Sequence, residues 1–99
     1  MNVKVCENEK EIQDAFSVRR TVFIDEQNVP EEEEIDQFEE DAAHFVSYEE
    51  GAPVAAGRFR VVDGFGKVER ICVLKEARNT GAGKAIMREI EAYAQKNGL

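Results

Sequence analysis

The sequence has 99 residues, which fits a single domain over residues 1–99. Apolar residues make up 42% of the chain, close to the share found in globular proteins, and no run approaches the roughly 18 apolar residues of a membrane span. Two cysteines, Cys6 and Cys72, are too few for a disulfide framework or a metal cluster. We therefore expect a cytoplasmic protein with reduced thiols, no metal and no membrane partner.

The charge divides unequally between the two halves of the chain. Residues 1–50 hold 16 acids and 4 bases, a net charge of −12, and residues 51–99 hold 5 acids and 9 bases, a net charge of +4. The acidic half would repel a phosphate backbone, so we do not expect a nucleic-acid partner. The division favours a small anion on the second half and a cation on the first.

The first elements are a strand and a helix. Residues 3–6 alternate between apolar and polar, which predicts a short strand. Asn8 followed by Glu11 is typical of a helix start, and apolar residues at helical spacing predict a helix over 9–24. Arg19 interrupts the apolar stripe of this helix. Such an arginine ordinarily pairs with a carboxylate, and contact with a ligand is the alternative.

Residues 25–41 hold ten acids and no base. A solvated loop with a helical turn is the simpler interpretation of such a run. The functional interpretation is an acidic rim that attracts a substrate carrying an amine.

Three further strands are predicted over residues 44–48, 54–62 and 67–74. The turn signals between them are close together, which favours an antiparallel meander. A last amphipathic helix starts at Gly81 and stops at Asn97-Gly98. The predicted class is therefore α+β, with a mainly antiparallel sheet.

The strand ending at Leu74 leads through small residues at 80–83 into the last helix. A helix N-terminus offers unpaired N–H groups and partial positive charge, and glycine lets an anion approach them. Arg78 and Lys84 add formal charge on either side. The dinucleotide fingerprint and the Walker loop both fail here, because Ile86 and Ala85 stand where those motifs require other residues.

The run Arg78-Asn79-Thr80-Gly81-Ala82-Gly83 resembles the Arg/Gln-x-x-Gly-x-Gly/Ala signature of the GNAT N-acyltransferase superfamily, with Val73 at the place of its strand valine. The family's order of strand, two helices, three strands and helix also matches. Residues 19–23, 26–30 and 34–36 are similar to a bacterial branch of small GNAT proteins. The resemblance covers essentially the whole chain.

The resemblance implies an acetyl-CoA site. Backbone groups of Ile71, Cys72 and Val73 would pair with the pantetheine arm, and the amide of Val73 would polarise the thioester carbonyl. The pyrophosphate would be wrapped by the loop and first helical turn, which comprise Arg78, Asn79, Thr80, Gly81, Ala82, Gly83 and Lys84.

The resemblance also implies a function, the transfer of an acetyl group from acetyl-CoA to a primary amine of a small molecule or peptide. The acceptor side would be formed by the first helix and the following loop, with Arg19, Glu26, Gln27, Glu34 and Asp36 as candidate substrate residues.

The acceptor amine must lose a proton before it attacks. Glu69 is the candidate base, since period-two counting places it on the same side of its strand as Ile71 and Val73. An ion pair with Arg58, Arg60 or Arg70 is the alternative. His44 and Cys72 are more readily explained as structural residues.

GNAT proteins continue beyond the last helix with a fifth strand, which forms the cofactor cleft, and a helix that commonly supplies a tyrosine acid. Because the sequence ends at Leu99, we expect either a fragment or a chain completed by a partner. The strand over 67–74 would then be an open edge, which favours a homodimer.

Two other functions stay open. A non-catalytic module could bind or sense acyl-CoA through the same loop, and turnover of an amine separates it from an enzyme. An interaction protein could bind a basic partner through residues 25–41, and charge reversal there would then matter while changes at 78–84 would not.

Overall fold

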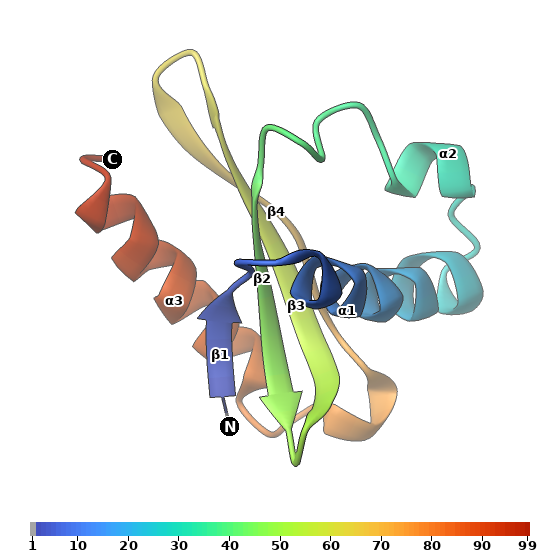
Figure 1. Ribbon diagram of the computed structural model, residues 1–99. Coiled ribbons are helices and arrows are strands. Elements are labelled where there is room, and N and C mark those ends of the chain that lie inside the picture. Colours follow the sequence, from blue (N-terminus) through green and yellow to red (C-terminus); the bar gives the residue numbers. More distant parts are fainter. Residues whose placement is uncertain (1) are drawn as a thin grey trace.

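The computed structural model describes residues 2–99 and has helices on both faces of one sheet (Figure 1). The strands are β1 (Asn2–Val5), β2 (Ala43–Glu49), β3 (Ala52–Val62) and β4 (Phe65–Val73). The helical segments are α1 (Glu9–Arg19), the π-helix η1 (Arg20–Glu26), α2 (Glu31–Glu34), the 3-10 turn η2 (Lys75–Ala77) and α3 (Ala82–Lys96).

The four strands form one antiparallel sheet in the order β1-β2-β3-β4. This confirms the predicted α+β class and the mainly antiparallel sheet. Among residues 2–99, β4 pairs only with β3, so its other edge is uncovered.

Two apolar clusters hold the helices against the sheet. On one face, Ala15 and Val18 of α1 pack with Val46, Ala56 and Cys72 of the strands. On the other face, α3 packs against the second cluster, formed by Phe45, Ala55, Phe59, Ala82, Ile86 and Ile90. Alternate strand residues therefore serve opposite faces, as the pleat requires, and the sheet separates α1 from α3 (Figure 1).

The predicted helix over 9–24 is helical throughout but changes type. Asn8 caps it as expected, because its Oδ1 accepts a hydrogen bond from the amide of Glu11 at 2.9 Å. From Arg20 the chain widens into a π-helix, where the amide of Gln27 donates to the carbonyl of Val22 at 3.2 Å. Such segments are rare and often lie at functional sites.

A β-bulge interrupts β4. The register passes from Ala56 opposite Cys72 to Arg58 opposite Glu69, so β4 carries one extra residue there. Arg70 lies in this bulge with a φ of +60°, a left-handed conformation unusual for a residue with a side chain. The bulge changes which face each residue of β4 occupies, and this decides the position of Glu69.

Candidate active site

The loop before α3 is shaped for an anion. Gly81 precedes the helix with a φ of +87°, where glycine adopts the left-handed conformation without strain. Within residues 2–99 no side chain caps this end of α3, so the first N–H groups, on Ala82, Gly83 and Lys84, have no side-chain partner there. A Cβ on Gly83 would meet only Val73 Cγ2, at 3.5 Å, so both glycines leave the approach open.

The uncovered edge of β4 ends beside this loop. The amide of Leu74 donates to the carbonyl of Val54 on β3 at 2.8 Å. Because backbone groups alternate along a strand, the N–H and C=O of Val73 point away from β3, to the open edge. The Val73 carbonyl accepts a hydrogen bond from Arg78 Nε at 3.1 Å. An open strand edge and an uncapped helix N-terminus therefore lie at the two ends of one short loop.

Arg78 also contacts the opposite side of the molecule. Its Nη2 donates to both carboxylate oxygens of Glu26, at 2.7 and 3.0 Å. Glu26 is the last residue of η1, so this ion pair joins a predicted cofactor residue to a predicted substrate residue. Gln27, which follows, is exposed.

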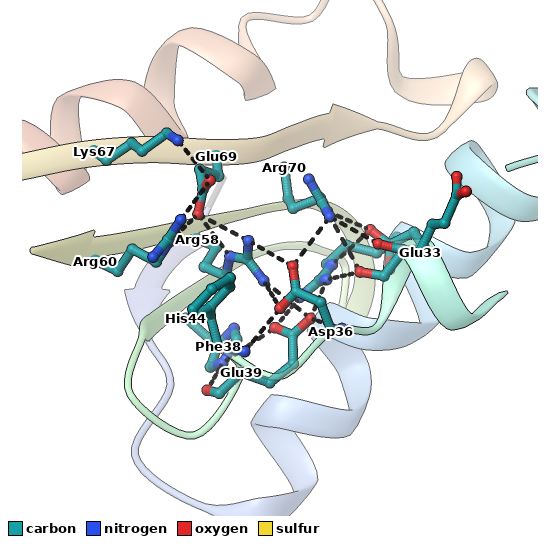
Figure 2. A network of polar contacts seen from close by, with 12 residues as sticks. Glu33, Asp36, Phe38, Glu39, His44, Arg58, Arg60, Lys67, Glu69 and Arg70 are labelled. Carbon is teal, nitrogen blue, oxygen red and sulfur yellow. Dashed lines mark hydrogen bonds and ion pairs between the residues drawn. The ribbon is translucent and has the colours of Figure 1, made fainter. Parts of the chain in front are cut away.

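The remaining acceptor-side residues belong to a buried polar network (Figure 2). Arg19 is fully buried; its Nε donates to Glu34 Oε1 at 3.1 Å, and two further nitrogens donate to Glu39. Arg58 donates to both oxygens of Asp36, at 2.8 and 3.1 Å. These pairs fix α2 and the segment after it to α1 and β3, so Arg19, Glu34 and Asp36 have structural partners.

A hollow of about 430 Å³ lies between η1, α2 and β4, and we name it the β4 hollow. Its lining residues are Phe23, Val29, Glu33, Glu34, Arg70 and Ile71. Its walls are partly apolar, two carboxylate residues line it, and it reaches β4 two residues before Val73. A larger hollow of about 640 Å³ is lined by α1, residues 35–42 and His44, and includes no residue of β4 or of the loop at 78–84.

A comparison with known protein families matches residues 10–99 to the acetyltransferase (GNAT) family. The chain belongs to the GNAT acetyltransferase family. It is 50% identical over 98 residues to YjcF of Bacillus subtilis strain 168, described as an uncharacterised N-acetyltransferase. The match spans 99% of this chain and 70% of YjcF. A second B. subtilis protein, YyaT, is 41% identical over 102 residues, covering 69% of its length.

Solved structures give the same fold. An acyl-CoA N-acyltransferase from Pseudomonas aeruginosa superposes with a TM-score of 0.85 at 22% identity, over 100% of this chain and 72% of that one. At this identity the similarity supports the fold and not the substrate. No helix within residues 2–99 of this GNAT protein has the length and apolar character needed to cross a membrane.

The predicted side for Glu69 is wrong. The bulge at Arg70 places Glu69 on the face of β4 that carries Cys72, opposite the side of Ile71 and Val73. Figure 2 shows its carboxylate among cationic side chains. Arg60 Nε donates to Glu69 Oε1 at 2.6 Å and Arg58 Nη2 donates to the same oxygen at 2.8 Å.

This pairing has a chemical consequence. The hydrogen bond from Arg60, followed by that from Arg58, lowers the pKa of Glu69 from 4.5 to about 2. A carboxylate with so low a pKa is a weak proton acceptor at neutral pH. The geometry therefore favours the ion-pair alternative for Glu69 over the role of base.

His44 and Cys72 have structural surroundings. His44 Nε2 lies 2.8 Å from the Glu39 carbonyl, its ring meets Phe16 edge-on, and burial lowers its pKa. Cys72 packs in the apolar cluster under α1, and burial raises its pKa to about 12. A thiol with that pKa is hardly ionised at neutral pH, which argues against a nucleophile.

Three features of the site do not follow from the sequence: the π-helix, the bulge at Arg70 and the role of Glu39. The sequence does contain one indication of the network: Arg19 interrupts an apolar helix stripe, and ten acids follow over residues 25–41. A buried arginine needs carboxylate partners, but the spacing does not say which acids supply them.

Proposed function

We propose that this GNAT protein transfers an acetyl group from acetyl-CoA to a primary amine. The observation that carries the proposal is the adjacency of two open features: the edge groups of Val73 and the uncapped N-terminus of α3. A thioester with a pantetheine amide needs strand-like backbone partners, and a diphosphate needs N–H donors. Acetyl-CoA carries both groups on one flexible arm.

In this proposal the loop before α3 binds the diphosphate, and the open edge of β4 binds the pantetheine arm. The N–H groups of Ala82, Gly83 and Lys84 hold the diphosphate, with Asn79 and Thr80 shaping the turn. Ile71 and Val73 align the pantetheine arm, while the backbone groups of Cys72 face β3 and hold the strand in place. The outward N–H of Val73 polarises the thioester carbonyl, where negative charge develops during attack.

The amine enters through the β4 hollow. Phe23 and Val29 offer an apolar wall for its carbon chain, and Glu33 offers an exposed carboxylate that attracts the ammonium form. After loss of a proton to a carboxylate or water, the nitrogen attacks the thioester carbon. A C–N bond forms, the C–S bond breaks, and the thiolate of CoA leaves and takes up a proton.

The charge division of the chain supports the same assignment. The anionic cofactor lies on the second half, whose net charge is +4, and the cationic acceptor approaches the acidic first half, whose net charge is −12. Steering of this kind raises encounter rates for both substrates without specifying the acceptor.

Calorimetric titration with acetyl-CoA tests the binding step. Gly83→Glu places a carboxylate at the second position of α3, where it suits the helix dipole and meets no steric block, yet repels a diphosphate. The matched control is Gly83→Gln, which has the same size without the charge. We expect micromolar binding to the wild type, weaker binding to Gly83→Gln because its side chain crowds the approach, and binding to Gly83→Glu that is at least tenfold weaker than to Gly83→Gln.

Turnover tests the chemistry and separates an enzyme from an acyl-CoA sensor. Release of the CoA thiol is measured against a panel of amines, polyamines and peptides. Thiol release that depends on an added amine supports the transferase. Tight binding with no turnover on any amine favours the sensor. Absence of binding to a folded wild-type chain contradicts the proposal itself.

A further inference from the structure

One side chain covers the open edge of β4. Arg78 Nε donates to the outward carbonyl of Val73 at 3.1 Å, and Arg78 Nη2 donates to both carboxylate oxygens of Glu26, at 2.7 and 3.0 Å. Glu26 ends η1 and Arg78 follows η2, so the contact spans 52 residues of sequence. Glu26 of η1, on the proposed acceptor side, thereby holds the Arg78 guanidinium beside the end of β4 at Val73.

This position conflicts with a ligand that extends the sheet. An amide pairing with β4 at Val73 needs both outward groups, the N–H as donor and the C=O as acceptor. Arg78 already bonds to one of the two acceptor positions of this C=O, and Glu26 holds the guanidinium there, so a ligand amide must share the carbonyl with Arg78 or displace it. The arginine also cannot give both its Nη2 hydrogens to Glu26 and a full set of hydrogen bonds to a diphosphate.

The ion pair is of a kind that exchanges. The Arg78 side chain is 42% exposed and that of Glu26 is 31% exposed, so solvent screens their attraction. A diphosphate at the N-terminus of α3 carries more charge than one carboxylate and adds the helix N–H groups as partners. It is therefore the stronger competitor for the guanidinium.

We infer that Glu26 and Arg78 form a latch over the cofactor edge, in which CoA binding exchanges the Glu26 carboxylate for the CoA diphosphate on Arg78. Glu26 is in this account a positioning residue that lowers the affinity for the cofactor. The inference rests on the proposed function, since it needs CoA as the ligand of this loop.

The test compares two single-charge removals on η1. Glu26→Gln removes the latch carboxylate. Asp25→Asn removes the same formal charge one residue earlier, from an exposed side chain with no ion pair or hydrogen bond among residues 2–99. Both variants reduce general repulsion of an anion, so only the latch distinguishes them. Dissociation constants for CoA are measured by calorimetry on both variants and the wild type, at low salt.

We expect Glu26→Gln to bind CoA up to about fivefold more tightly than Asp25→Asn, the range set by an exposed ion pair. In an Arg78→Ala background the two variants should bind CoA equally, because no guanidinium remains to be held. Equal affinity of the two variants in the wild-type background overturns the latch while leaving the proposed function intact. Weaker binding by Glu26→Gln also overturns it, since Glu26 would then prepare Arg78 for the cofactor. No CoA binding by any folded variant overturns both.

Discussion

Arg19 and Glu39 form a two-point ion pair in the interior of the protein, with Nη1 to Oε1 at 2.9 Å and Nη2 to Oε2 at 2.7 Å. Arg19 is completely buried, and it also donates to the side chain and the carbonyl of Glu34. One guanidinium thus fixes the acidic segment after η1 against α1. The acidic run at 25–41 is therefore only partly a solvated surface, because several of its acids neutralise buried arginines.

Replacing Arg19 should destabilise the fold strongly. Arg19→Leu removes the buried cation that Glu34 and Glu39 share and leaves them only Arg70 and Arg58, each at 3.1 Å. Breaking a buried pair in this way costs about 3–5 kcal/mol. The free energy of unfolding is measured by urea denaturation. Arg20→Leu is the matched control, since the neighbouring side chain is 48% exposed and reaches Glu31 only at 3.7 Å. A similar loss in both variants would contradict the structural role of Arg19.

Acid should weaken the network through Glu69. Pairing with Arg60 and Arg58 lowers its pKa from 4.5 to about 2 in the folded state, so the ionised form is stabilised by folding. That contribution is complete above about pH 4.5 and is lost as the pH falls toward 2. We expect Glu69→Gln to lower the urea midpoint at pH 7 and to flatten the acid limb between pH 4.5 and 2. Glu91→Gln, on the exposed side of α3, should leave the profile of the wild type unchanged.

The close approach of α3 to the sheet depends on Gly57. A Cβ there would lie 2.7 Å from Ile71 Cδ1 and 2.8 Å from Ile86 Cγ2. Gly57→Ala should therefore cost about 1–3 kcal/mol of stability through overpacking. Gly83→Ala is the comparison, because its Cβ meets an ordinary 3.5 Å contact in a helix and should stabilise by about 0.5–1 kcal/mol. Thermal unfolding of both variants checks the opposite signs.

Both thiols should react slowly in the native state. Burial raises the pKa of Cys72 and of Cys6 to about 12, so little thiolate exists at pH 8. We expect labelling by a disulfide reagent to be at least tenfold slower in the folded chain than in urea. Cys72→Ala should retain CoA binding, because the backbone of β4 and not the thiol is proposed to meet the cofactor. Rapid native-state labelling of Cys72 would show that the strand opens.

Local patterns were sufficient to predict most of the fold. Strand alternation gave the meander, the Asn8 cap gave the start of α1, and Asn97-Gly98 gave the end of α3. The position of Glu69 could not be predicted by counting, because a single extra residue at Arg70 reverses the alternation. That residue is stabilised in its unusual conformation by tertiary partners, Glu33, Glu34 and Asp36, which no local pattern identifies.

Local patterns likewise predict one part of the candidate site, the loop before α3, and not the other, the acceptor side. The small residues at 80–83 identify the loop directly, since their backbone conformation and lack of bulk are local properties. The acceptor-side residues depend on long-range pairing. The sequence could not reveal that Glu34 binds Arg19 and Arg70, or that Asp36 binds Arg58 and Arg70. Nor could it show that Arg78 and Glu26, 52 residues apart, are in contact.

The most direct test of the central claim is an amide chemical-shift titration of the 15N-labelled chain with acetyl-CoA. We predict that the amides of Val73, Ala82, Gly83 and Lys84 shift together and saturate with one dissociation constant, with smaller changes at Ile71. Shifts confined to the hollow beside α1 and His44, or no saturable shift at Val73 and the start of α3, would contradict the assignment of this edge and loop to the cofactor.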